Sequence, residues 1–238
     1  MVWRGEAVVW SSNYVREIIS DVSLKLNLLS KWKYVYPLAE YYDAFLDSCY
    51  TGKVRSFIYL VAIRLSVMDS TKHITYDLSC IPGLADFLRL WNNYNLNGRL
   101  IYRATTTSLI DDYVRSRSGV SLAGGDDNLL SFWSVSPYTS HYFAVRYIER
   151  FHGNPRDVRV LVMEYDDSLC AKDWYDNFTP EYSVYSNGKL YNFGYIRYLR
   201  ELEVRCYVVR TSSLKYALTY DEFNEVFKYL PKEFVYRP

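Results

Sequence analysis

The sequence has no glutamine among its 238 residues, and it shows little charge bias. The net charge of +1 gives no bulk positive field of the kind that binds nucleic acid or an anionic membrane. A hydrophobic fraction of 50% and an aromatic fraction of 18% exclude disorder as a description of the whole chain. Missing glutamine and abundant charge are typical of hot environments, although asparagine is plentiful here. We therefore expect the source to be a thermophile or a virus of one, an archaeal virus included.

Cysteine and histidine are also scarce, with four and three residues. No two of them have the spacing of a zinc site, so we expect no metal. Reduced, buried thiols are the default expectation, and one or two disulfides are the alternative in a hyperthermophile. His141 and His152 have no partner that the sequence assigns, so we expect ordinary structural histidines. The four cysteines are Cys49, Cys80, Cys170 and Cys206.

Long apolar runs are missing as well. The longest, residues 57–68, contains Arg64 and is too short to span a bilayer. The N-terminal residues include Arg4 and Glu6, and the apolar segment of a signal peptide does not follow. We expect a soluble, cytoplasmic protein with no membrane partner. Export by a route without a signal peptide, or delivery into a host, is the alternative.

Apolar periodicity divides the chain near Gly98 into a helical part and a part rich in strands. Thr219 and Glu222 have the spacing of a capping box at the start of the last helix. Helices are predicted over residues 12–29, 37–49, 53–68, 84–94, 109–117, 137–151 and 219–230. Strands are predicted over residues 100–104, 129–136, 158–165 and 203–210, with an irregular segment over 166–192. The predicted class is α+β in a single domain, 1–238: an N-terminal helical layer (1–98) packs on a mostly antiparallel sheet with a C-terminal helix (99–238).

Three of the predicted strands carry polar groups in an apolar context. Arg103 lies near the end of the first, and its rigid fork of donors suits a pyrophosphate. Ser134 and Ser136 lie in the second, where a serine beside an acid can hold that acid in one rotamer. Glu201 and Glu203 come last, and two acids two residues apart share one face if both lie in a strand. Such a pair can stabilise a cationic ribosyl centre, although solvated acids on an edge strand are the alternative interpretation.

The order of these motifs resembles the Arg-Ser-Glu class of mono-ADP-ribosyltransferases, the C3-like and binary-toxin-like clostridial group. The matching stretches are Tyr102-Arg103, Ser134-Val135-Ser136 and Glu201-Leu202-Glu203. The chain departs from the family pattern at Ala104, where glycine is usual, and at Val135, where threonine is usual. The resemblance covers most of the chain, with motifs between residues 102 and 204. It implies a split β-sheet core of ADP-ribosyltransferase type, with NAD as the donor substrate.

The resemblance also implies a role for each motif. Arg103 would contact the phosphates of NAD, and Ser134 would position Glu203 and touch the nicotinamide ribose. Glu203 would bond the ribose 2′-hydroxyl and stabilise an oxocarbenium-like transition state. Glu201 would orient and deprotonate the acceptor, and a glutamate there favours an arginine side chain on a target protein. Further NAD-binding positions implied are Tyr102, Ala104, Ser136 and Phe143. Candidates to stack on nicotinamide are Trp133, Tyr142, Phe143 and an aromatic residue within 174–193.

Two other functions are compatible with the same residues. One is an NAD glycohydrolase that uses water as the acceptor. The other is a catalytically inactive fold that serves as an interaction or virion protein through its tyrosine-rich surface. A nucleic-acid acceptor is disfavoured because the sequence has no basic groove signature.

Overall fold

The computed structural model describes residues 13–35, 84–107, 130–150, 152–172, 183–186, 189–192, 201–207, 209 and 213–236. They belong to two compact units. The first unit falls within residues 1–29, 95–172 and 202–237, and the second within 30–94, 173–201 and 238. The helices predicted over 37–49, 53–68 and 109–117 lie outside the described residues.

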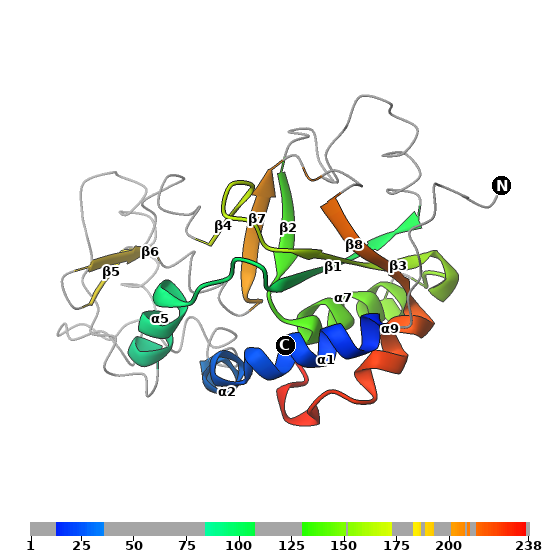
Figure 1. The fold of residues 1–238 in the computed structure, drawn as a ribbon, viewed down its shortest axis with the longest axis horizontal. Helices are drawn as coiled ribbons and strands as arrows, with labels where there is room; N and C mark the ends of the chain where they lie inside the picture. Colours follow the sequence, from blue (N-terminus) through cyan, green and yellow to red (C-terminus); the bar gives the residue numbers. More distant parts are fainter. Residues whose placement is uncertain are drawn as a thin grey trace, which may run out of the picture. The chain divides into compact units, whose positions relative to one another are not determined.

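The first unit is built on a six-stranded antiparallel sheet with the order β4-β7-β2-β1-β3-β8 (Figure 1). Its strands are β1 (Leu100–Thr106), β2 (Leu130–Ser134), β3 (Val158–Glu164), β4 (Cys170–Ala171), β7 (Glu203–Tyr207) and β8 (Leu214–Thr219). Val160, Leu161 and Val162 of β3 are all fully buried, so both faces of this strand are covered. Helices beside an antiparallel sheet confirm the predicted α+β class.

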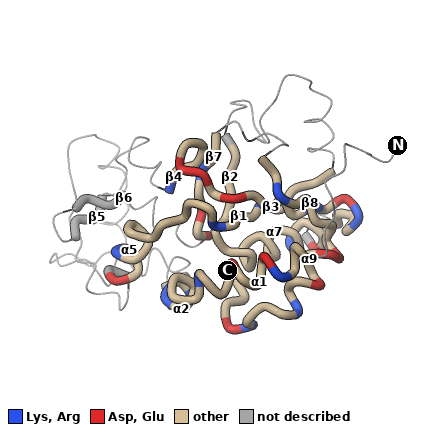
Figure 2. Tube along the Cα trace, in the orientation of Figure 1, with Lys and Arg blue, Asp and Glu red and all other residues tan. Residues whose placement is uncertain are grey.

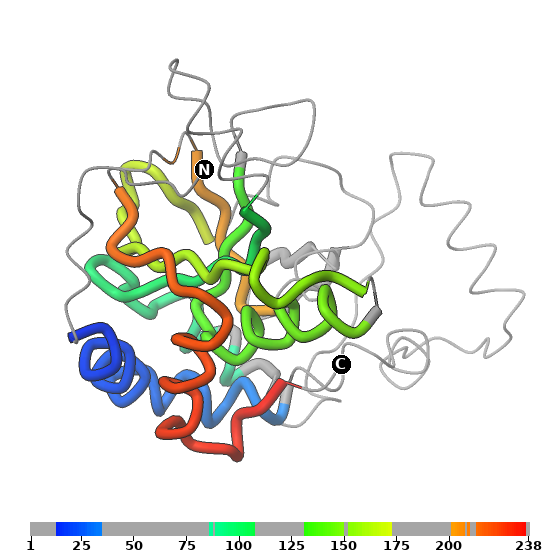
Figure 3. Tube along the Cα trace, turned by 90° about the vertical axis from the view of Figure 1, so that its right-hand side faces the viewer, coloured from blue at the N-terminus to red at the C-terminus, as the bar shows by residue number. Residues whose placement is uncertain are grey.

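Three helices lie on one side of the sheet: α1 (Tyr14–Leu24), α7 (Pro137–Arg150) and α9 (Tyr220–Phe227) (Figures 1 and 3). Helix α7 packs on β1 and β3, while α9 packs on β3, β8 and α1. His141 of α7 stacks on Phe227 of α9 with 3.9 Å between the ring centroids. Its Nε2 lies 2.9 Å from Oδ1 of Asn224, so His141 is a structural histidine, as expected.

The single helix predicted over residues 12–29 is wrong. The chain forms two helices, α1 and α2 (Leu26–Val35), separated at Lys25. The side chain of Lys25 is completely buried and bonds to the backbone carbonyls of Leu100 in β1 and of Val135 just after β2, which apolar periodicity does not reveal. The N–H of Lys25 still bonds to the carbonyls of Asp21 and Val22. These two carbonyls in the last turn of α1 therefore keep a hydrogen-bond partner where the helix ends.

Helix α9 begins at the predicted capping box. The Oγ1 of Thr219 accepts from the backbone N–H of Glu222 at 3.2 Å. The Oε2 of Glu222 in turn accepts from the backbone N–H of Thr219 at 2.8 Å. These two bonds satisfy N–H groups that an uncapped helix start would leave exposed, and they confirm the prediction.

Three strand features were missed by the sequence interpretation. β8 follows the strand that was predicted to be the last, and β4 lies inside the segment predicted to be irregular. In the second unit, β5 (Ser183–Ser186) and β6 (Lys189–Asn192) form a hairpin within that same segment. The Asn-Gly dipeptide between them is a strong hairpin signal that could have revealed it. The predicted helix over 84–94 is confirmed by α5 (Leu84–Asn93) of the second unit.

Charges of both signs are interspersed along the described parts of the chain (Figure 2). This mixture agrees with the net charge of +1. Among the described residues, no helix combines the length and the apolar character needed to cross a membrane.

Candidate functional site

The strand register brings the three motifs of the sequence into one region of the sheet. Ser134, at the end of β2, pairs with Tyr102 of β1 on one side and with Glu203 of β7 on the other. Residues directly opposite in an antiparallel pair have Cβ atoms about 5 Å apart and project to the same face. Ser134 and Glu203 are therefore cross-strand neighbours, although 69 positions of the numbering separate them.

Arg103 lies on β1, next to Tyr102. Its Nη1 donates to the backbone carbonyl of Phe132 on β2 at 3.2 Å. The side chain is partly exposed, and desolvation of the guanidinium lowers the pKa of Arg103 to about 10, while the negative charge of Glu203 acts in the opposite direction. Arg103 thus stays cationic at neutral pH and lies within electrostatic reach of Glu203.

A second cation, Arg205, lies on the face of Ser134 and Glu203. Arg205 pairs with Phe132 across β2 and β7, and its guanidinium lies 5.3 Å from the centre of the Phe132 ring. Phe132 keeps 43% of its surface exposed. Phe132 and Arg205 thus share the face of Ser134 and Glu203, whereas Arg103, the neighbour of Tyr102 on β1, projects from the other face of the sheet by strand alternation.

The end of β2 is held rigidly. The Oγ of Ser134 accepts from the backbone N–H of Ser136 at 3.0 Å, and both serines are buried. Between them, the N–H of Val135 donates to the carbonyl of Leu202 at 2.9 Å, which ties the end of β2 to the turn before Glu203. These bonds fix the backbone on both sides of the Ser134–Glu203 pair.

The two glutamates do not share a strand. Glu203 is the first residue of β7, whereas Glu201 lies in the preceding turn. Leu202 between them has a φ of 46°, a left-handed conformation that an extended strand does not contain. The condition for the same-face argument, an extended segment that contains both acids, is therefore not met. Glu201 is grouped with the second unit, while Glu203 belongs to the first.

The other predicted NAD-binding residues differ in burial and in their contacts. Tyr102 is fully buried, and its hydroxyl donates to Oδ2 of Asp21 on α1 at 2.9 Å. Ala104 follows Arg103 on β1 and is partly exposed. Ser136 is buried directly before α7. Phe143 is partly exposed on α7, where its ring packs edge-on against Tyr142 at 5.4 Å.

The aromatic candidates outside residues 174–193 each contact other side chains of the protein. Trp133 is buried, and its indole N–H donates to Oγ of Ser131 at 2.8 Å. Tyr142 packs against Tyr236 near the C-terminus at 5.2 Å between centroids. The aromatic residues between 174 and 193 lie outside the described residues, except for those in β5 and β6 of the second unit.

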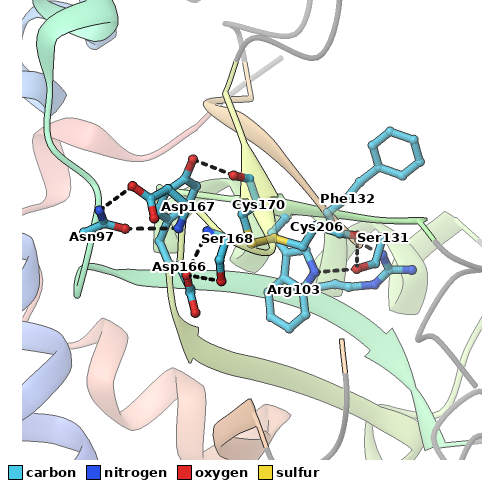
Figure 4. Close-up of a disulfide and its surroundings, with 11 residues drawn as sticks. Asn97, Arg103, Ser131, Phe132, Asp166, Asp167, Ser168, Cys170 and Cys206 are labelled. Atoms are coloured by element: carbon cyan, nitrogen blue, oxygen red, sulfur yellow. Dashed lines mark hydrogen bonds between the residues drawn. A yellow bond between two sulfur atoms is a disulfide. The ribbon is translucent and has the colours of Figure 1, made fainter. Parts of the chain in front are cut away.

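A disulfide joins Cys170 of β4 to Cys206 of β7, which pair directly across the two strands (Figure 4). The default expectation of reduced thiols is wrong for these two residues, because the sheet register brings cysteines from distant positions side by side. Cys206 lies three residues after Glu203, so the crosslink holds the strand that carries the proposed catalytic acid. Cys49 and Cys80 lie outside the described residues.

Two further residues near the site carried no functional signal in the sequence. Asp21 and Lys25 of the α1 region are buried, and their side chains contact the backbone of β1 and of the segment after β2. Their spacing of four residues, acid first, fits an ordinary exposed helical ion pair, so the sequence gives no hint of their burial. Within the described residues, no group of three histidine, cysteine or acidic side chains is arranged to hold a metal.

Comparison with known proteins adds one relative. The chain is 52% identical over 225 residues to a protein named Uncharacterized protein 67, from Sulfolobus islandicus filamentous virus (isolate Iceland/Hveragerdi). The match covers 93% of this chain and 98% of the viral protein, so the chain belongs to the family of this viral protein. No family model and no solved structure matches the chain.

Proposed function

We propose that the protein is a mono-ADP-ribosyltransferase that transfers ADP-ribose from NAD to an arginine side chain of a target protein. The observation that carries this proposal is the pairing of Ser134 with Glu203 on neighbouring strands, with Arg103 in electrostatic reach of Glu203. Three motifs that resemble one enzyme family in sequence thereby meet in one region of a sheet. A fold of ADP-ribosyltransferase type is part of the same proposal and is supported by the α+β architecture, in which the six strands of the first unit form one sheet.

Arg103 binds the pyrophosphate of NAD in this proposal. Its guanidinium already donates one bond to the carbonyl of Phe132, which fixes the side chain and leaves further N–H groups of the fork for phosphate oxygens. Because its charge persists at neutral pH, the fork can make charge-assisted hydrogen bonds to both phosphates. Arg205 and the exposed ring of Phe132 lie on the face of Ser134 and Glu203.

Glu203 acts on the ribose. Its carboxylate accepts a hydrogen bond from the 2′-hydroxyl and stabilises the positive charge that develops as the bond from C1′ to nicotinamide breaks. The electron pair of that bond leaves with nicotinamide. Ser134, directly opposite, can donate its hydroxyl proton to the carboxylate while its oxygen accepts from Ser136. This contact would keep Glu203 in one rotamer.

Glu201 serves the acceptor. A guanidinium nitrogen of the target attacks C1′ of the ribose, and Glu201 accepts the proton that this nitrogen loses. The left-handed turn at Leu202 sets Glu201 apart from the strand that holds Glu203. Two acids with different backbone environments suit two roles, one on the donor and one on the acceptor.

An NAD glycohydrolase is the second candidate. Arg103, Ser134 and Glu203 suffice for it, because water can take the place of the guanidinium at C1′. All three lie in the first unit, whereas Glu201 is grouped with the second, and this observation favours keeping hydrolysis as an alternative.

The proposal is tested by nicotinamide release from NAD, measured with and without agmatine as an arginine analogue. Wild type, Glu203→Gln and Glu201→Gln are compared, the last two as a matched pair that removes one charge each. A transferase releases nicotinamide faster with agmatine, loses release in Glu203→Gln, and loses only the agmatine-dependent part in Glu201→Gln.

Release that ignores both agmatine and the Glu201 substitution indicates the glycohydrolase or a strict requirement for the protein target. Incubation with labelled NAD and a host lysate separates these two outcomes, because only a transferase labels a protein. No release by the wild type at its working temperature, with no thermal shift on adding NAD, contradicts an enzyme and favours the interaction or virion protein.

A further inference from the structure

A buried ion pair joins helix α1 to the strands that carry the proposed site. Lys25 is completely buried, and Asp21 keeps only 6% of its surface exposed. The Nζ of Lys25 lies 2.6 Å from Oδ2 of Asp21. It also donates to the carbonyl of Val135 at 3.0 Å and to the carbonyl of Leu100. The three N–H groups of the ammonium thus have three acceptors.

Asp21 is held just as completely. Its Oδ1 accepts from the backbone N–H of Leu100 at 3.0 Å, and its Oδ2 accepts from the hydroxyl of Tyr102 at 2.9 Å. Both the N–H and the carbonyl of Leu100, at the start of β1, are therefore bonded to the Asp21–Lys25 ion pair. Tyr102 is fully buried, which ties a second residue of the same strand to the pair.

Net stability alone does not explain why Asp21 and Lys25 are buried as charged groups. Desolvation lowers the pKa of Lys25, and the neighbouring carboxylate of Asp21 acts in the opposite direction. A buried ion pair of good geometry contributes little net stability compared with apolar residues of similar volume. What such a pair can supply is a fixed geometry for the groups that it contacts.

The groups that this pair contacts lead directly to the proposed site. Leu100 and Tyr102 lie on the strand of Arg103, and Tyr102 is its immediate neighbour. Val135 stands between Ser134 and Ser136, and its N–H donates to the carbonyl of Leu202, the residue before Glu203. One buried ammonium thus connects the start of β1 with the junction where β2 ends and β7 begins.

We propose that Asp21 and Lys25 are positioning residues, which set the spacing between the Arg103 strand and the Ser134–Glu203 pair for catalysis. The inference rests on the proposed function, because it assigns these contacts to the alignment of donor-binding and reacting groups. Neither side chain touches the substrate. An error of about 1 Å at a reacting centre can reduce the rate by roughly 100-fold, so a backbone clamp of this kind has a measurable effect.

The test compares Lys25→Met, the double variant Asp21→Asn/Lys25→Met, and a control, Lys215→Met. Lys215 also joins α1 to the sheet, since its Nζ lies 3.0 Å from Glu17 and 2.7 Å from Glu164. Its side chain is partly exposed and bonds to these two carboxylates, away from the junction of β2 and β7. Thermal unfolding, kcat and KM for nicotinamide release are measured for each variant at a temperature where it is folded.

Lys25→Met leaves a buried carboxylate without its cation, so its unfolding temperature falls. The double variant removes both charges and recovers much of that loss, because the amide oxygen that Asp21→Asn introduces still accepts hydrogen bonds. The carbonyls of Leu100 and Val135 have lost their common donor in both variants. We expect kcat to stay about 10- to 100-fold below wild type in both, with KM for NAD changed by at most a few-fold.

Recovery of kcat together with stability in the double variant would mean that the pair is only structural, and it would overturn the inference. An equal loss of kcat in Lys215→Met would also overturn it, because any loosening of α1 would then suffice. An inactive wild type contradicts the proposed function and removes the inference with it, whereas an active wild type with unchanged Lys25→Met kinetics contradicts the inference alone.

Discussion

Removal of the Cys170–Cys206 crosslink is expected to lower stability strongly. The two cysteines are 36 positions apart, and closing a loop of that length in the unfolded chain corresponds to about 4 kcal/mol at 25 °C. For a chain of 238 residues, each kcal/mol shifts the unfolding temperature by about 2–4 °C. Loss of the crosslink should therefore lower that temperature by roughly 8–16 °C.

The assay is thermal unfolding of wild type, Cys170→Ala, Cys206→Ala and the double variant, with and without reductant. Either single substitution already breaks the crosslink, so both should lose nearly as much stability as the double variant. Reductant should bring the wild type close to the variants and change the variants much less.

Independent thiols would give a different pattern. Each substitution would then produce a small effect, the two effects would add in the double variant, and reductant would leave the wild type unchanged. Alkylation of the unfolded, unreduced protein followed by peptide mass mapping provides a direct check. Labelled Cys170 and Cys206 would refute the crosslink.

Two further predictions concern α9 and its neighbour α7. Thr219→Ala removes both bonds of the Thr219 hydroxyl, to the backbone N–H and to Oε2 of Glu222, and should lower the free energy of unfolding by about 1 kcal/mol in denaturant titration. Thr219→Ser keeps the hydroxyl and should have little effect. Burial lowers the pKa of His141, with Lys232 adding to the decrease and the hydrogen bond to Asn224 opposing it. Because the unfolded state then binds the proton more readily, stability should fall as pH drops below about 6.5. His141→Gln should lack this component, and an unchanged pH profile in that variant would contradict the assignment.

Local patterns in the sequence were sufficient for much of the fold. The apolar, β-branched run of β3 and the capping box of α9 were predicted correctly, because each depends on residues close together in the chain. The end of α1 at Lys25 was missed because the side chain of Lys25 bonds to the carbonyls of Leu100 and Val135, which are 75 and 110 positions away in the sequence. Tertiary contacts of this kind leave no local periodicity.

The candidate site, too, could be predicted from the sequence only in part. The order of Arg103, Ser134 and Glu203 along the chain was sufficient to propose that they meet. The register places Ser134 opposite Glu203 and opposite Tyr102, the neighbour of Arg103. Sequence spacing could not reveal the left-handed turn at Leu202, which separates Glu201 from the strand. The Cys170–Cys206 crosslink depends on the register of β4 against β7, which spacing alone does not supply.

The most direct test of the central claim is the affinity of the protein for ADP-ribose, measured by calorimetric titration near its working temperature. We expect the wild type to bind, and Arg103→Ala to bind about 10-fold or more weakly, because a hydrogen-bonded charge contributes about 1.5–3 kcal/mol. Arg103→Lys should recover only part of the affinity, since it keeps the charge but loses the fork. Arg156→Ala, at an exposed position before β3, serves as the control and should bind like the wild type. Absence of binding by the wild type, or equal binding by Arg103→Ala, would contradict an NAD site built on Arg103, Ser134 and Glu203.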